Sequence, residues 1–127
     1  MRNILRATNR FLAFLSLSSL TLVAADLTIP LSGSVSQKKV TFQCDQHAHG
    51  LGLPSGPFVV TYLNGGGNNL AVLPINGRSL IFSGVMSADG SRYAADRFIW
   101  WDVGSRGIHL YLNSIQGRDQ SACDVVH

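Results

Sequence analysis

The segment LAVLPINGRSLIFSGVM, residues 70–86, decides the fold. Asn76-Gly77 is a two-residue hairpin signal, because both residue types tolerate the positive φ that a tight turn between antiparallel strands needs. After the turn, residues 79–86 alternate between two faces, with Leu80 and Phe82 on one of them, which is the period of a strand. The segment therefore predicts two antiparallel strands, at 70–75 and 79–86, joined by a tight turn.

Similar short runs extend in both directions from this hairpin, separated by turn residues at the spacing of roughly 8 to 12 that is typical of sandwiches and barrels. The loop 65–69, Gly-Gly-Gly-Asn-Asn, supplies the positive φ values of another hairpin. No helix is expected. Seven or eight strands that close on themselves leave no exposed edge, so we predict an all-β fold, a small antiparallel β-barrel. The other runs are 39–44, 58–64, 91–94, 97–102, 108–112 and a last short one around Cys123.

The N-terminal residues have the pattern of a secretory signal peptide. Arginines at positions 2, 6 and 10 precede an apolar run, 11–23, and small residues at 23–25 suit cleavage after Ala25. The apolar run is shorter than the roughly 20 residues that a membrane-spanning helix needs, although an uncleaved anchor is the alternative. No cysteine lies near the cleavage point, which argues against an acyl anchor. We expect a signal peptide at 1–25, a flexible leader at 26–37 and one domain at 38–127, exported and without a membrane span.

Charge and composition exclude several classes of function. The basic balance of +3 comes from the three signal-peptide arginines, and residues 26–127 hold seven Lys or Arg against seven Asp. We therefore do not expect the protein to bind nucleic acid, since recognition of nucleic acid needs a basic surface. The chain has no Glu and no Gly-x-Ser-x-Gly motif, so we expect no enzyme activity. No cofactor is indicated.

Two cysteines, Cys44 and Cys123, lie near the two ends of the predicted domain. In an exported chain such a pair is most simply a disulfide, with free thiols as the alternative. His47-Ala48-His49 has the alternate spacing that brings two imidazoles to one metal ion, but no third ligand is evident, and exposed loop histidines are the preferred interpretation. No metal site is therefore predicted.

Two further motifs resemble the signature of the MliC/PliC family of lysozyme inhibitors. They are the run 82–93, Phe-Ser-Gly-Val-Met-Ser-Ala-Asp-Gly-Ser-Arg-Tyr, and 100–104, Trp-Trp-Asp-Val-Gly. In the family a Ser-Gly-Ser-Gly-Ala-Arg-Tyr-like run precedes a Trp-x-Lys-Gly turn. Residues 41–44 and Cys123 resemble the family's framing motifs. The resemblance spans about residues 38–124. It implies an eight-stranded barrel whose two adjacent loops enter the cleft of a c-type lysozyme. It also implies a periplasmic protein of a Gram-negative bacterium, with a role in evading host defence.

The resemblance also implies where the contacts lie. A serine of the first family loop and a lysine of the second meet the two catalytic carboxylates of the target, and these positions are occupied here by Asp89 and Val103. We hypothesise that Ser87 or Ser91 supplies the hydroxyl and Arg106 the cation, while Asp89 pairs with Arg92 or with basic residues of the target. The full set of expected lysozyme-binding residues is Ser87, Asp89, Ser91, Arg92, Tyr93, Trp101, Val103 and Arg106.

Trp100 and Trp101 should point to opposite sides of one strand, one into the core and the other toward the surface or a partner. Two other functions remain open for the same scaffold. One is inhibition of a different class of muramidase, prompted by Asp89 and Val103. The other is binding of a small cell-envelope ligand at the barrel mouth near Trp101 and His47. Whether the domain forms a homodimer is left open as well.

Overall fold

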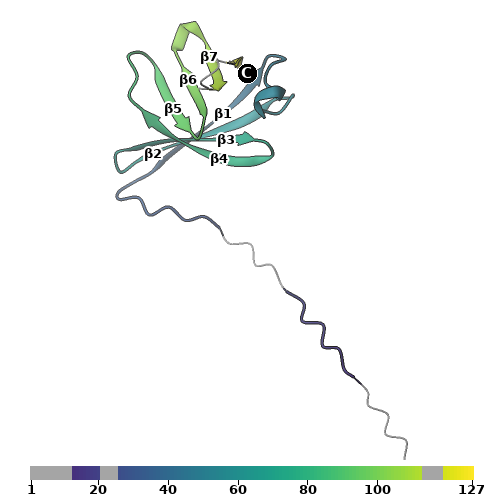
Figure 1. The fold of residues 1–127 in the computed structure, drawn as a ribbon. Coiled ribbons are helices and arrows are strands. Elements are labelled where there is room, and N and C mark those ends of the chain that lie inside the picture. Colours follow the sequence, from purple (N-terminus) through teal and green to yellow (C-terminus); the bar gives the residue numbers. More distant parts are fainter. Residues whose placement is uncertain (1–12, 21–25, 113–118) are drawn as a thin grey trace, which may run out of the picture.

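The computed structural model describes residues 13–20, 26–112 and 119–127. Within these residues, eight strands, each hydrogen-bonded to the next in sequence order, form a closed antiparallel barrel. Figure 1 labels all of them except the last. The strands are β1 (Ser36–Cys44), β2 (Phe58–Gly65), β3 (Asn68–Ile75), β4 (Arg78–Val85), β5 (Ser91–Ala95), β6 (Phe98–Asp102), β7 (Ile108–Leu112) and β8 (Gln120–Val125). The predicted fold class is confirmed.

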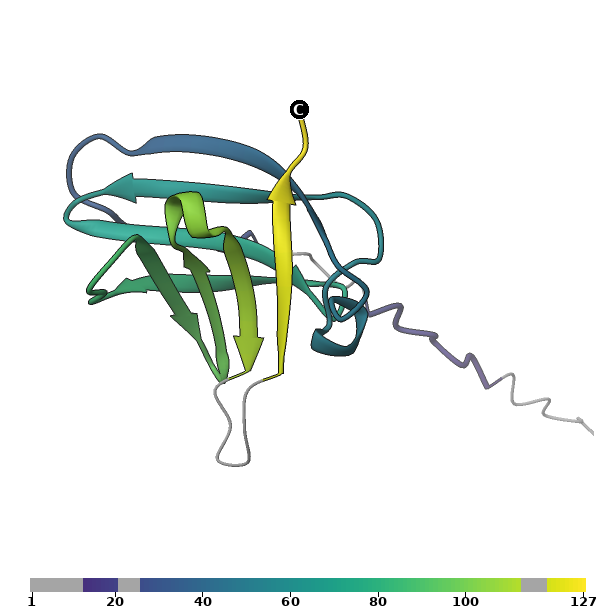
Figure 2. The same ribbon diagram turned by 90° about the horizontal axis from the view of Figure 1, so that it is seen from above.

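The central hairpin has the expected register. Ile75 pairs with Arg78 across the Asn76-Gly77 turn, and both turn residues have positive φ, 50° and 70°. In Figure 2, β1–β4 lie as one layer and β5–β8 cross them steeply. The barrel closes where β8 pairs with β1, from Phe42 opposite Val125 to Cys44 opposite Cys123. Each strand is thus paired with the strand that follows it in the sequence, and only the pair of β1 and β8 joins strands that are distant in the sequence.

Aromatic side chains fill the interior. Trp100 is fully buried, and its ring packs nearly perpendicular to that of Phe42, at 5.1 Å between ring centroids. Its indole N–H donates a hydrogen bond to the Tyr62 hydroxyl at 2.9 Å. Burial raises the pKa of Tyr62 to about 12, although the Trp100 hydrogen bond acts in the opposite direction. An indole in an apolar interior needs such a partner, so Tyr62 allows Trp100 to occupy the core.

Two details differ from the sequence-based expectations. The barrel begins at Ser36, which pairs with Asn64, two residues before Lys38. The residues before β1 lie close to the β2–β3 hairpin. This is evident at Gly65, where an added Cβ would be 2.8 Å from the Ser34 carbonyl oxygen. The expectation of no helix is also wrong, since two short 3-10 turns occur, η1 (His49–Leu51) and η2 (Gly104–Arg106). Such single turns carry too little periodicity to show in a sequence.

The expected signal peptide lies largely outside the described residues, at 1–12 and 21–25, and so does its cleavage point. Residues 13–20 have neither helix nor strand and are exposed. Within the described ranges, no helix combines the length and the apolar character needed to span a bilayer.

Candidate functional site: the joined loops at one end of the barrel

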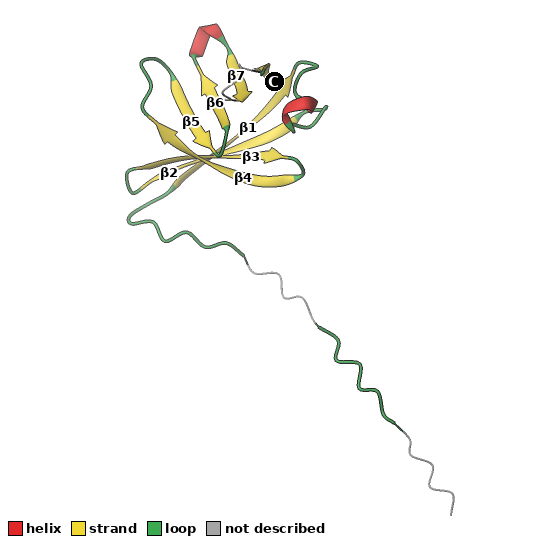
Figure 3. Cartoon of the chain, viewed as in Figure 1, coloured by secondary structure: helices red, strands yellow, loops and turns green. Residues whose placement is uncertain are grey.

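Two loops come together at one end of the barrel, because one precedes β5 and the other follows its neighbour β6. We call residues 86–90, between β4 and β5, the first loop, and residues 103–107, between β6 and β7 and including η2, the second loop. Figure 3 shows η2 as the red turn that joins β6 to β7. The two loops are brought together because Ser91, just after the first loop, pairs with Asp102, just before the second.

Backbone contact joins the loops tightly. Gly90 has φ +65°, and a Cβ added there would be 1.9 Å from the carbonyl oxygen of Asp102. Only glycine fits a left-handed backbone position at this separation. The approach of the two loops therefore depends on the missing side chain of Gly90.

Each loop is also closed by short-range hydrogen bonds. The Ser87 hydroxyl donates to the backbone carbonyl of Asp89, and the Asp89 N–H is 3.4 Å from the same hydroxyl. In the second loop, the Asp102 carboxylate accepts a bond from the Gly104 N–H at 2.9 Å, and the Val103 N–H donates to the Gly107 carbonyl at 3.0 Å. The loops are thus preformed, which reduces the entropy that binding a partner costs.

Trp101 supports the first loop through a hydrogen bond to its backbone. Its indole N–H donates to the Asp89 carbonyl oxygen at 2.9 Å, and the Arg92 guanidinium lies 5.8 Å from the centre of its ring. Its ring also contacts Tyr111, at 6.4 Å between centroids. Trp100 is buried while Trp101 is only partly so, as the alternation predicted. Trp101 holds the loop in addition to presenting a surface.

Asp89 and Arg106 form an ion pair across the two loops. Both side chains remain largely exposed, Arg106 by 63% and Asp89 by 60%. The hypothesis that Asp89 pairs with Arg92 is therefore wrong, because Arg92 lies against the Trp101 ring instead. The cation proposed to face the target is thus already paired with the anion at the family's serine position.

The structure brings most of the predicted binding residues to this end. Ser91 and Arg106 are exposed, and Val103 is half-buried. Tyr93 is different, because it is only 8% exposed and packs against Tyr62 at 5.7 Å between centroids. Burial, with the charge of Asp102, raises the pKa of Tyr93. Tyr93 therefore packs mainly inside the barrel end, and the small exposed part of its side chain lines the hollow beside the first loop.

Two hollows flank the joined loops. One, of about 510 Å³, has a polar lining that includes Asn64, Asn69, Ser91 and Arg92. The other, of about 230 Å³, is lined in part by Trp101, Val103, Arg106 and Tyr111. Asn64 and Asn69 were not anticipated, because nothing local in the sequence places the β2–β3 hairpin beside the first loop. The role of Asp102, in contrast, could be predicted from the sequence, because Asp-x-Gly is a pattern typical of turns.

The histidine motif lies elsewhere, after β1. His47 and His49 are exposed, as the loop interpretation predicted. Across the described parts of the chain, no three His, Cys, Asp or Glu side chains gather closely enough to hold a metal ion.

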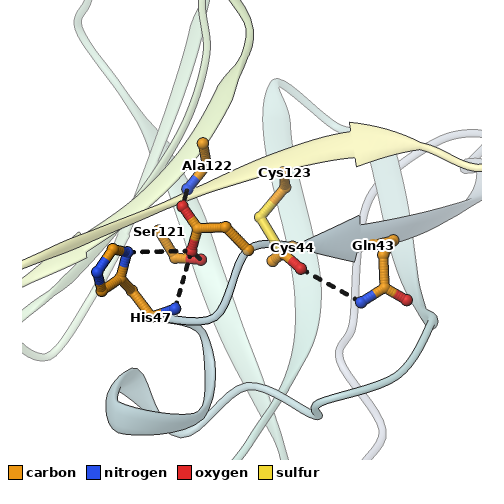
Figure 4. A network of polar contacts seen from close by, with 7 residues as sticks. Gln43, Cys44, His47, Ser121, Ala122 and Cys123 are labelled. Carbon is orange, nitrogen blue, oxygen red and sulfur yellow. Dashed lines mark hydrogen bonds and ion pairs between the residues drawn. A yellow bond between two sulfur atoms is a disulfide. The ribbon is translucent and has the colours of Figure 1, made fainter.

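Next to this motif, Asp45 is the centre of a polar cluster that links the loop to β8. Figure 4 labels its partners His47, Ser121 and Ala122. Its carboxylate accepts bonds from the Ser121 hydroxyl at 2.7 Å, the Ala122 N–H at 3.1 Å and the His47 N–H at 3.0 Å. Burial raises the pKa of Asp45, but these hydrogen bonds outweigh that effect and lower the pKa to about 2. The cluster adjoins the Cys44–Cys123 disulfide, whose predicted pairing is confirmed.

Fold and site together define a small disulfide-containing β-barrel domain that presents two preformed, joined loops. The sequence pattern of the family described as "Membrane-bound lysozyme-inhibitor of c-type lysozyme" matches residues 42–111. The chain belongs to this family, which confirms the resemblance seen in the sequence.

Individual relatives agree with this assignment. A membrane-bound lysozyme inhibitor of C-type lysozyme from Pseudomonas aeruginosa is 38% identical over 79 residues, which are 61% of this chain and 56% of the relative. Its counterpart from Cupriavidus necator is 33% identical over 70 residues, 55% of this chain and 50% of that one. The chain thus spans about half the length of the curated relatives that it matches.

A crystal structure of Pseudomonas aeruginosa MliC in complex with hen egg white lysozyme has the same fold, with a TM-score of 0.60 and 31% sequence identity. The similarity covers 84% of this chain and 99% of that one.

Proposed function

We propose that this chain is a protein inhibitor that binds c-type lysozyme and blocks its active-site cleft with the first and second loops. The observation that carries the proposal is the joined, preformed pair of loops at the end of a barrel of the lysozyme-inhibitor family. The similarity to MliC, which has been crystallised with hen egg white lysozyme, supports this choice of partner.

The chemistry of the target explains what the loops must offer. Glycoside hydrolases of this type depend on one protonated and one ionised carboxyl group. A guanidinium matches an ionised carboxylate with two parallel hydrogen bonds, and such charge-assisted bonds are stronger than neutral ones. Arg106 is the exposed cation of the second loop. It would occupy the cleft and pair with the ionised carboxylate, so that the sugar chain cannot enter.

Of the two candidate serines, Ser91 is better placed to supply the hydroxyl. Ser87 is engaged with the backbone of its own loop through both its donor and its acceptor. Ser91 is exposed and has a hydrogen bond to Tyr93, and its oxygen can also accept a bond from a protonated carboxyl group. We therefore assign the hydroxyl contact to Ser91 and a loop-closing role to Ser87.

We also propose that the protein acts by binding alone, without catalysis, and that it protects peptidoglycan in the periplasm. Its family is named for inhibition. Relatives from two Gram-negative bacteria are named membrane-bound lysozyme inhibitors, which supports a location in the cell envelope. The signal-peptide pattern at 1–25 supports export.

Inhibition of hen egg white lysozyme by the purified protein tests the proposal. We expect Arg106→Ala to weaken inhibition about tenfold or more, because a charge-assisted bond in a cleft is lost. Arg78→Ala is the matched control, since Arg78 is exposed in the β3–β4 hairpin. Unchanged potency of the Arg106 variant removes this residue from the mechanism. Lysozyme turnover unaffected at a saturating dose of the unmodified protein refutes the function.

The Asp89–Arg106 pair also favours a second candidate, inhibition of a different class of muramidase. The loops of this chain present an anion beside the cation, where the family pattern has serine and lysine. A panel of c-type and other muramidases separates the candidates, because potency against another class alone supports the second one.

A further inference from the structure

We propose that Asp89 is a specificity-determining residue: it neutralises and restrains Arg106, and so lowers the affinity of the loops for a cleft whose charged groups are carboxylates. This inference rests on the proposed function and adds a residue that works against binding. It is drawn from the ion pair between the loops.

The way in which the first loop holds Asp89 explains why this residue pairs with Arg106. The Ser87 hydroxyl bond and the Trp101 indole bond both hold the backbone carbonyl of Asp89, which leaves the carboxylate free to point to the second loop. There it meets a guanidinium of Arg106. Arg92, the other cation of this region, lies against the Trp101 ring. Asp89 therefore removes the net positive charge from the second loop.

Asp89 has two effects on binding to a carboxylate-lined cleft, and both weaken it. Breaking an exposed ion pair to free Arg106 costs little, corresponding to at most about fivefold in affinity. Bringing Asp89 close to target carboxylates in a poorly solvated cleft costs more, because like charges repel strongly where water is excluded. Both costs disappear when the Asp89 charge is removed, and the repulsion is the larger of the two, so the uncharged variant should bind more strongly.

The test is inhibition of hen egg white lysozyme by Asp89→Asn, which keeps the size and an acceptor oxygen and removes the charge. We expect the inhibition constant to fall by about tenfold. Asp96→Asn is the control, since it changes the net charge equally at an exposed residue in the β5–β6 turn and should leave the constant unchanged. An unchanged or weakened Asp89→Asn variant overturns the inference.

A second comparison checks that Asp89 acts through Arg106. In the background of Arg106→Gln, the gain from Asp89→Asn should be smaller, because no cation remains to be released and only the repulsion between Asp89 and the target carboxylates is removed. A gain of the same size in both backgrounds overturns the assigned pairing.

The free protein gives a readout that does not depend on lysozyme. NMR relaxation of the Arg106 Nε–H group should show a more mobile side chain in Asp89→Asn than in the unmodified protein or Asp96→Asn. Unaltered mobility overturns the pairing even if the proposed function fails. Inhibition by Asp89→Asn but not by the unmodified protein supports the inference and assigns the lack of activity to Asp89.

Discussion

At the scale of single residues, Gly90 determines whether the two loops can touch. Its φ of +65° and its closeness to the Asp102 carbonyl leave no room for a side chain. Gly77 in the β3–β4 turn does not have this second restriction, because its φ is +70° but nothing lies within 4 Å of an added Cβ. The contrast separates backbone strain from loss of the contact between loops.

Gly90→Ala should therefore separate the loops and abolish most inhibition, whereas Gly77→Ala should retain it. Both variants should lose stability through the strained φ, by about 1 kcal/mol, with a further loss for Gly90→Ala from the steric clash. Inhibition assays and chemical unfolding check this. Equal inhibition by both variants would show that contact between the loops is not needed.

At the scale of elements, the Asp45 cluster ties the loop after β1 to β8. Three hydrogen bonds converge on its carboxylate, and the Asp45 N–H donates in turn to the Ala122 carbonyl at 2.9 Å. The loop carries η1, whose Leu51 is 5% exposed and belongs to the core. The cluster thus fixes a segment that covers part of the interior.

The lowered pKa of Asp45 predicts how stability depends on pH. Its value of about 2 in the folded protein is below the ordinary 3.8, so the charged form favours folding. This contribution is complete above about pH 4 and is lost as the pH falls toward 2. Asp45→Asn should lower stability at pH 7 by about 1 kcal/mol, a value reduced for solvent screening.

Melting temperatures at pH 7 and pH 2.5 measure the effect. The difference between the two values should be smaller in Asp45→Asn than in the unmodified protein. Asp124→Asn is the control, because Asp124 is an exposed aspartate on β8, the strand to which the Asp45 carboxylate is hydrogen-bonded. If the two variants respond identically to acid, the Asp45 cluster is not the source of the acid sensitivity.

At the scale of the whole molecule, the barrel closes between its first and last strands. Cys44 and Cys123 are register partners at this seam, and their disulfide spans a sequence separation of 79. A loop of that length removes about 4 to 5 kcal/mol of chain entropy from the unfolded state in the chain-entropy model. That is comparable to the entire stability of a small domain.

Reduction of the disulfide should therefore lower the free energy of unfolding by up to about 4 to 5 kcal/mol. Urea unfolding with and without reductant measures the change. The double variant Cys44→Ala/Cys123→Ala controls for direct effects of the reductant and should resemble the reduced protein. A midpoint that does not move would mean that strand pairing alone holds the seam.

The strands were predictable because their signals are local. The Asn76-Gly77 turn and the flanking alternation placed β3 and β4 within two residues of their observed bounds. The resemblance to a family pattern located the loop positions Asp89 and Val103, and Ser87 and Arg106 were proposed because they lie near them in the sequence; their contacts with a target stay predictions. The short turns η1 and η2 were missed, since one turn of 3-10 helix has no periodic signature.

The sequence by itself determined the all-β class, the order of the strands and the cysteine pair, because turn residues and period-2 alternation act between near neighbours. Only the tertiary structure decided that Asp89 pairs with Arg106 rather than Arg92, that Tyr93 is buried, and that Asn64 and Asn69 border the site. These outcomes depend on barrel curvature and stagger, which bring distant segments together and which no local pattern encodes.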